Sequence, residues 1–219
     1  MFRSARRLAG RIPGSWRTAG LVFLMLVVAS LAGRQAVLRY VYPFSYREEI
    51  ITYADRNGLD PLFVAAIVRT ESGFKPGAVS PKGAVGLMQI MPDTGRWAAE
   101  NLGFAHFEPD MLKDPATNLM IGTWYLAELR KEFGSNLVLV VAAYNAGRGQ
   151  VREWVKKDGY ELRPGPHSTV SPWPGAEVTE DYPVAKLALA ETRDYVRRVL
   201  ASLKTYRRLY GPVLESGSS

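Results

Sequence analysis

The stretch Asp60-Pro-Leu-Phe-Val-Ala-Ala-Ile-Val-Arg-Thr-Glu-Ser-Gly73 decides the fold class. Asp60 is a favourable N-cap residue, Pro61 suits a first helical turn, and a glycine such as Gly73 commonly ends a helix. Nearly every side chain between these signals is apolar, and a helix that is apolar almost all round is buried inside a domain. The sequence therefore predicts a core helix that ends at Glu71-Ser72.

Similar start and stop signals predict further helices on both sides of this core helix. Ser45 with Glu48 resembles a capping box, and Asp93, Asp114 and Asn136 are the other expected N-caps. No strand alternation is visible, so the sequence predicts a mainly α fold. The expected helices cover residues 45–57, 93–101, 115–133, 136–146, 150–157 and 184–206.

Residues 160–182 interrupt this helical pattern with four prolines. A segment of that length without regular structure is typical of a functional lid or a linker. We therefore expect a long proline-rich loop there, inside a domain over residues 43–211. Residues 212–219 are expected to form a disordered tail.

The net charge of +7 is confined to the amino terminus. Residues 1–42 hold seven arginines and no acid, so residues 43–219 hold 21 basic and 21 acidic side chains. This neutral remainder gives no reason to expect a nucleic-acid partner. The absence of cysteine excludes disulfides, thiolate zinc sites and cysteine nucleophiles, and two histidines are too few for a histidine-rich metal site.

An apolar run over residues 19–33 follows five of the arginines. Its 15 residues lie between the ~20 of a membrane span and the about 7–15 of a signal-peptide core. Arg34 can snorkel, and apolar residues continue to Tyr42. We predict a basic cytoplasmic arm and a single-pass membrane anchor over residues 1–42, with the following domain outside the cytoplasm. The alternative is secretion after signal cleavage near Ala32.

Glu71 is the strongest candidate for chemistry on physical grounds. Its carboxylate leaves an apolar helix, where burial and the negative end of the helix dipole both favour the protonated form. A carboxylic acid held protonated near neutral pH is what the protonation of a glycosidic oxygen requires. The alternative is an exposed glutamate in a last helical turn.

Four ordered motifs give the sequence a resemblance to a known family. It resembles the soluble-lytic-transglycosylase catalytic domain, a goose-lysozyme-like branch of peptidoglycan-cleaving enzymes (glycoside hydrolase family 23 type), over residues 45–210. The motifs are Glu71-Ser-Gly-Phe74, Ser80-Pro-Lys-Gly-Ala-Val-Gly-Leu-Met-Gln-Ile-Met-Pro92, Ala143-Tyr-Asn-Ala-Gly147 and Glu191-Thr-Arg-Asp-Tyr-Val196.

The resemblance implies a lysozyme-like helical domain with a substrate groove and a role for each matching residue. Glu71 matches the single catalytic acid/base. The expected substrate-binding residues are Ser80, Gln89, Met91, Tyr144, Asn145, Glu191 and Tyr195. Three of these have plainer interpretations: Met91 as core, Asn145 as a partner of backbone groups at a helix end, and Glu191 as an exposed helical charge.

The implied reaction cleaves the bond between N-acetylmuramic acid and N-acetylglucosamine and leaves 1,6-anhydro ends, without a metal or cofactor. We expect a monomer whose partners are peptidoglycan strands and, through the amino-terminal helix, the membrane. Most glycosidases use two carboxylates, and Asp110 and Glu177 remain open as a second one. The alternative functions are a muramidase on the same fold and a non-catalytic wall-binding or scaffold module.

Overall fold

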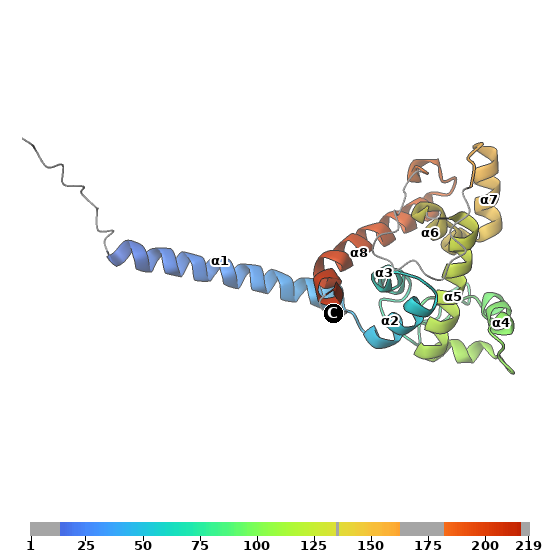
Figure 1. The fold of residues 1–219 in the computed structure, drawn as a ribbon, viewed down its shortest axis with the longest axis horizontal. Helices are drawn as coiled ribbons and strands as arrows, with labels where there is room; N and C mark the ends of the chain where they lie inside the picture. The colour runs from blue at the N-terminus through green and yellow to red at the C-terminus, as the bar shows by residue number, and fades with distance from the viewer. Residues whose placement is uncertain (1–13, 135, 163–181, 216–219) are drawn as a thin grey trace, which may run out of the picture. The chain divides into compact units, whose positions relative to one another are not determined.

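The computed structural model describes residues 14–134, 136–162 and 182–215 (Figure 1). The chain divides into two units, Met1–Val41 and Tyr42–Ser219. Among the described residues, β structure is limited to isolated bridges that join Val85 to Val79 and to Ile90, so the predicted mainly α class is confirmed. The helices are α1 (Gly14–Val41), α2 (Arg47–Arg56), α3 (Pro61–Glu71), α4 (Pro92–Asn101), the 3₁₀ helix η1 (Pro109–Lys113), α5 (Pro115–Phe133), α6 (Leu137–Ala146), α7 (Arg148–Lys157), the 3₁₀ helix η2 (Val184–Lys186) and α8 (Ala190–Glu215).

The first unit consists of the continuous helix α1, in which apolar side chains from Leu21 to Val28 are exposed. Its segment Ala19–Val41 has 23 residues, and its most apolar part has a mean hydropathy of 2.0 with no share buried. By length and composition this helix can cross a membrane, although a signal sequence has the same properties. The predicted apolar run over residues 19–33 is thus part of a longer helix.

In the second unit α3 forms the core helix that the sequence predicts. Every residue from Leu62 to Val68 is at most 4% exposed. The Asp60 carboxylate accepts a hydrogen bond from the Leu62 amide at 2.8 Å, Pro61 occupies the first turn, and Gly73 has a left-handed φ of 60° just after the helix. α3 packs most extensively against α8, and Figure 1 shows it between α8 and α5.

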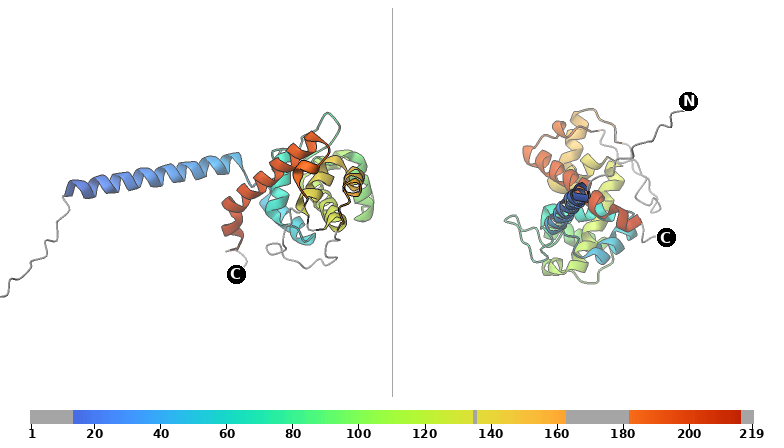
Figure 2. Two further views of the ribbon diagram at one scale, coloured as in Figure 1. Left: turned by 90° about the horizontal axis from the view of Figure 1, so that it is seen from above. Right: turned by 90° about the vertical axis from the view of Figure 1, so that its left-hand side faces the viewer.

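α5 and α6 begin at the predicted N-caps. Asp114 accepts a hydrogen bond from the Thr117 amide at 2.8 Å, and Asn136 accepts one from the Leu139 amide at 3.1 Å. The first seven residues of α6 are buried, and this helix contacts α5, α7 and α8. Figure 2 shows α8 as one long helix that runs across the unit.

The predicted capping box at Ser45 is wrong. Tyr46 precedes α2 with a left-handed φ of 54° and makes no side-chain capping bond. The chain before α2 is held by α8 instead, because the Tyr206 hydroxyl donates to the Pro43 carbonyl at 2.7 Å. α2 starts at Arg47, two residues after the predicted start at residue 45.

The predicted N-cap at Asp93 is also wrong. α4 starts at Pro92, and Met91 is its N-cap residue without a side-chain hydrogen bond. Asp93 lies in the first turn and pairs with Arg96 at 3.0 Å. Proline at the first position sets the start, because its missing amide and preset φ suit that position.

The last helix begins later and ends later than predicted. Val184–Lys186 forms η2, and the Arg193 guanidinium donates to the carbonyls of Leu187 and Ala188 at 2.5 and 3.1 Å just before α8 begins. α8 then continues past residue 206 to Glu215, so helix covers the first part of the predicted tail. Residues 216–219 lie outside the described residues.

Most of the predicted proline-rich loop, residues 163–181, lies outside the described residues. Its two flanks contact each other, because the rings of Tyr160 and Tyr182 meet edge to face with centroids 5.3 Å apart. Tyr182 is 1% exposed and donates to Asp158 at 2.6 Å. Tyr160 and Tyr182, which flank residues 163–181, therefore lie in contact within the second unit.

Candidate active site

The loop of residues 72–91 joins the carboxyl end of α3 to α4, and polar side chains hold it in place. The Ser72 hydroxyl donates to the Leu87 carbonyl at 2.8 Å. Asn118 of α5 is fully buried, donates to the Val85 carbonyl at 2.9 Å and accepts from the Met88 amide at 2.8 Å. A buried amide that is hydrogen-bonded on both sides fixes the loop against α5.

Two glycines allow this loop to approach α5 closely. A Cβ atom at Gly86, whose φ is 83°, would overlap the Asn118 amide and the Leu112 carbonyl. A Cβ atom at Gly122 would overlap the sulfur of Met88. The position of the loop beside Glu71 therefore depends on glycine at both positions, because a larger residue would push the loop away from α5.

Glu71, the last residue of α3, is partly buried. The Tyr195 hydroxyl of α8 donates to Glu71 Oε1 at 2.5 Å, although the two residues are 124 positions apart in the chain. Burial raises the pKa of Glu71 from its ordinary 4.5 to about 7, and the Tyr195 hydrogen bond and the charge of Arg198 act in the opposite direction. Burial dominates, so both the acid and the carboxylate form are available near neutral pH.

Tyr144 and Tyr195 approach Glu71 from α6 and α8. The Tyr144 hydroxyl donates to the Met88 carbonyl at 2.7 Å, which ties α6 to the loop. Burial first, and then the negative charge of Glu71, raise the pKa of both phenols well above the ordinary value. Both tyrosines therefore stay neutral and act as hydrogen-bond donors.

Ser80 and Gln89, expected to bind sugar, contact their own loop. Ser80 Oγ accepts from the Ala84 amide at 3.0 Å. Gln89 has a left-handed φ of 48°, which is uncommon for a residue other than glycine, and its amide nitrogen donates to the carbonyls of Ala78 and Gly86 at 3.1 and 2.9 Å. The donors of Gln89 thus stabilise an unfavourable backbone conformation next to the site.

The remaining expected residues differ in their surroundings. Met91 is 43% exposed, so it is not a core residue. Asn145 is exposed and accepts a hydrogen bond from the buried Thr192 hydroxyl at 3.0 Å, which joins α6 to α8. The Glu191 side chain is 74% exposed and lies 4.0 Å from Lys82 of the loop. Glu71, Tyr144 and Tyr195 therefore form the centre of the candidate site, and the others lie around it.

Sequence reasoning missed three residues that shape this site. Asn118 holds the loop, Thr192 orients Asn145, and Arg198 lowers the pKa of Glu71. Asn118 carried a usable signal, because an asparagine inside an otherwise apolar helix stretch requires hydrogen-bond partners. Thr192 and Arg198 had no comparable sequence signal: Thr192 lies in the last motif, and Arg198 lies two residues after it.

Of the two acids left open as a second carboxylate, the structure describes only Asp110, which lies on η1. The Asp110 side chain is 82% exposed and pairs with Lys113 at 2.8 Å on η1, and Glu177 lies outside the described residues. Within the described ranges, no three acidic or histidine side chains gather as metal ligands would.

Comparisons with known proteins identify the family to which this chain belongs. Residues 48–163 match the Transglycosylase SLT domain family. The soluble lytic murein transglycosylase of Escherichia coli K12 is 34% identical over 196 residues, which cover 88% of this chain and 28% of that protein. The membrane-bound lytic murein transglycosylase C of Edwardsiella ictaluri is 30% identical over 210 residues, which cover 88% of this chain and 54% of that protein.

A solved structure has the same helical arrangement. The lytic transglycosylase Slt of Pseudomonas aeruginosa, solved as an inactive glutamate-to-glutamine mutant, superposes with a TM-score of 0.64 at 32% identity. The match covers 76% of this chain and 24% of that one. The chain thus spans about a quarter of the length of the soluble relatives it matches and about half of the membrane-bound one.

Proposed function

Since this chain belongs to the Transglycosylase SLT domain family, we propose that it is a lytic transglycosylase acting on peptidoglycan. It cleaves the bond between N-acetylmuramic acid and N-acetylglucosamine and leaves a 1,6-anhydro-muramyl end. The names of the soluble and membrane-bound relatives support this reaction class. All of the proposed site residues lie in the second unit of one chain, so the proposed site needs no residue from another chain.

Glu71 performs both proton transfers in the proposed reaction. It donates its proton to the glycosidic oxygen, and the acetamido oxygen of the muramyl residue attacks the anomeric carbon as the C–O bond breaks. The Glu71 carboxylate then removes the proton of the 6-hydroxyl group, whose oxygen displaces the acetamido oxygen and closes the anhydro ring. Glu71 ends protonated again, and no water is consumed.

The observation that carries this proposal is the environment of Glu71. A pKa of about 7 makes one carboxyl group effective first as an acid and then as a base at neutral pH. The Tyr195 hydroxyl donates a hydrogen bond of 2.5 Å to that carboxyl group and so fixes its orientation. The inactive glutamate-to-glutamine mutant of the Pseudomonas aeruginosa relative supports an essential glutamate, a role that we assign here to Glu71.

The other site residues have two kinds of role in this proposal. Met91 and Tyr144 contact the sugar rings, because Met91 is exposed at the end of the loop and Tyr144 lies near Glu71. Ser80 and Gln89 act indirectly, since their polar atoms hold the backbone of the loop. Asn145 and Glu191 border the site from α6 and the start of α8.

Mass analysis of the released muropeptides tests the proposed reaction. Purified protein is incubated with murein sacculi, and the products are separated and weighed. We expect anhydro-muropeptides, which are lighter by one water than the products of hydrolysis. Reducing ends instead would identify a muramidase, and bound but uncleaved murein would identify a wall-binding module.

We further propose that α1 is an uncleaved single-pass anchor with the second unit outside the cytoplasm. The arginine-rich arm before the span favours the cytoplasmic side, and the 23-residue segment Ala19–Val41 is long enough to cross the bilayer. Amino-terminal sequencing of the protein from membranes tests this topology. A mature amino terminus at Gly33 would show signal cleavage and overturn it.

A further inference from the structure

We propose that Trp97, Trp124 and Tyr125, together with Arg148, form a second carbohydrate-binding surface for pyranose rings of the glycan chain, beyond the rings next to Glu71. We call these four residues the aromatic platform. This inference rests on the proposed function, because it assigns the platform to the same substrate. It predicts that long glycan chains bind more tightly than short ones.

The platform is built on two helices that pack against each other. The Trp97 ring of α4 meets the Trp124 ring of α5 with centroids 4.9 Å apart at 60°, and the Tyr125 ring at 6.2 Å and 89°. Trp97 is 36% exposed, and the other two rings are partly buried. A partly exposed tryptophan that packs against two other rings presents apolar surface to solvent while losing little conformational freedom on binding.

The platform is continuous with the proposed catalytic centre. The Tyr125 ring lies 5.7 Å from the Tyr144 ring, and Tyr144 is close enough to Glu71 for the glutamate charge to raise its pKa. Aromatic rings therefore follow one another from the neighbourhood of Glu71 to the surface at Trp97. A polysaccharide repeats the same ring shape along its length, so such a row of aromatic surfaces matches it better than it matches a compact ligand.

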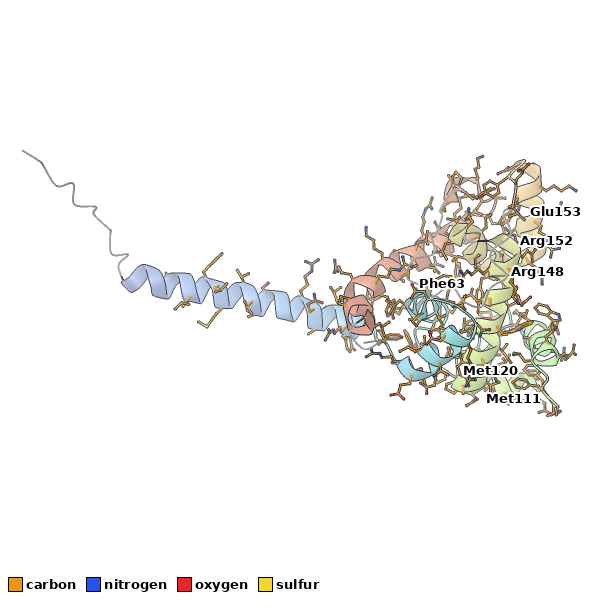
Figure 3. The ribbon with its side chains drawn as sticks, in the orientation of Figure 1. Phe63, Met111, Met120, Arg148, Arg152 and Glu153 are labelled. Carbon is orange, nitrogen blue, oxygen red and sulfur yellow. The ribbon has the colours of Figure 1, made fainter. Side chains whose placement is uncertain are left out.

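Arg148 adds a cation to one side of the platform. Its guanidinium lies 5.6 Å from the centre of the Trp97 ring and pairs with Glu132 at 2.8 Å, and its side chain is 39% exposed. Figure 3 shows Arg148 and Arg152 on neighbouring turns of α7, and both pair with Glu132. The buried Arg148 Nε has no hydrogen-bond partner among the described residues.

That nitrogen is buried and cannot reach a ligand, so the donors available to a ligand lie on the exposed part of the Arg148 side chain. A guanidinium fixed over an aromatic ring with part of its surface in solvent can donate hydrogen bonds to sugar hydroxyls or to the carboxylates of the peptide stems. The combination of a rigid apolar ring and an oriented donor suits a sugar ring, which has apolar faces and hydroxyl groups at its edge.

Binding measurements with chains of different length test the platform. The full-length Glu71→Gln protein in detergent is titrated calorimetrically with a disaccharide, a tetrasaccharide and an octasaccharide of alternating N-acetylglucosamine and N-acetylmuramic acid. We expect Trp97→Leu in this background to weaken octasaccharide binding by about 3- to 10-fold, the size of one aromatic contact. Disaccharide binding changes less than twofold, because that ligand cannot reach Trp97.

The same titrations are made with two further variants, Trp97→Phe and Arg148→Gln. Phenylalanine keeps an aromatic face and should restore most of the octasaccharide affinity, whereas Arg148→Gln should reduce it by a smaller factor. These two variants decide the question if Trp97→Leu does not fold, as judged by circular dichroism. The inference is overturned if Trp97→Leu lowers the affinity equally for all three oligosaccharides, or lowers it for none of them. If the wild-type protein releases anhydro-muropeptides but the effect of Trp97→Leu on affinity does not depend on glycan length, the platform is refuted and the proposed function stands.

Discussion

α3 carries a carboxylate at each end, and the two have opposite surroundings. At the amino end Asp60 is 6% exposed, accepts from the Leu62 amide at 2.8 Å and accepts from the Arg207 guanidinium at 3.1 Å. At the carboxyl end Glu71 accepts one short hydrogen bond from a neutral phenol, and its pKa is raised to about 7. The Asp60 carboxylate is paired with the Arg207 guanidinium, whereas the Glu71 carboxyl group is buried where a negative charge is unfavourable.

Burial and the helix dipole explain this difference. Burial is the largest cause of the raised pKa of Glu71, and the Tyr195 hydrogen bond and the charge of Arg198 offset only part of it. The partial negative charge at the carboxyl end of a helix acts in the same direction as burial, whereas the amino end of a helix attracts a carboxylate such as that of Asp60. The same helix therefore uses one carboxylate for stability and, in the proposed function, the other for proton transfer. Substitutions at the two ends should separate stability from activity.

The largest effect is expected for Glu71→Gln. Glutamine preserves size and can still accept the Tyr195 hydrogen bond, but it cannot exchange a proton. General acid–base catalysis contributes roughly 10²–10⁴-fold, and one group performs both transfers here, so we expect a loss near the upper limit. The measurement is the rate of anhydro-muropeptide release by protein with an unchanged circular dichroism spectrum. The exposed Asp93→Asn variant is the matched control and should retain wild-type activity. A Glu71→Gln rate within about tenfold of wild type would contradict the assignment.

The same variant should change how stability depends on pH. The folded protein keeps the Glu71 proton up to about pH 7, whereas the unfolded chain releases it near 4.5. Ionisation of Glu71 therefore lowers the free energy of unfolding progressively across this window as the pH rises. Glu71→Gln avoids this loss, so it should be more stable than wild type above pH 7, by at most about 3 kcal/mol, and equally stable below pH 4.5.

Urea titrations at both ends of this pH window measure that difference. The Asp93→Asn variant should run parallel to wild type across the whole range, because Asp93 is exposed in the first turn of α4. A pH-independent difference between Glu71→Gln and wild type would show that Glu71 ionises normally in the folded protein.

Removing the carboxylate at the other end of α3 should cost stability and leave the chemistry intact. Asp60→Ala removes the N-cap and the partner of the partly exposed Arg207, and we expect a loss of about 2 kcal/mol. Asp60→Asn keeps a side-chain oxygen for the Leu62 amide and should lose about 1 kcal/mol or less. Urea unfolding measures both losses, and anhydro-product release per folded molecule should match wild type. A large loss of activity in folded Asp60→Asn would contradict the separation of roles.

The smallest effect is expected for Tyr195→Phe. The Tyr195 hydrogen bond lowers the pKa of Glu71, so its removal should raise that pKa further. The proposed acid works in its protonated form, so activity should fall as the pH rises through about 7 in wild type. In Tyr195→Phe the alkaline limb of the kcat/KM profile should move upward by about one pH unit. A loss of activity without any shift of that limb would indicate a role for Tyr195 in substrate contact instead.

Local sequence signals predicted α3, α5 and α6 well because the interactions behind them are local. Asp60, Asp114 and Asn136 each bond to an amide two or three residues away, so the cap and its partner are adjacent in the sequence. The same reasoning failed at Ser45, where α8 holds the preceding chain through Tyr206 and moves the helix start. It also failed at Asp93, where Pro92 sets the first turn.

The candidate site shows the same division between local and distant determinants. The sequence alone placed Glu71 at the end of a buried helix and predicted the direction of its pKa shift, because burial and the helix dipole follow from the residues around it. Only the tertiary structure decided that Tyr195, 124 positions away, donates to Glu71, and that buried Asn118 holds the loop beside it. Such contacts depend on how α5 and α8 pack against α3, which periodicity and capping signals do not specify.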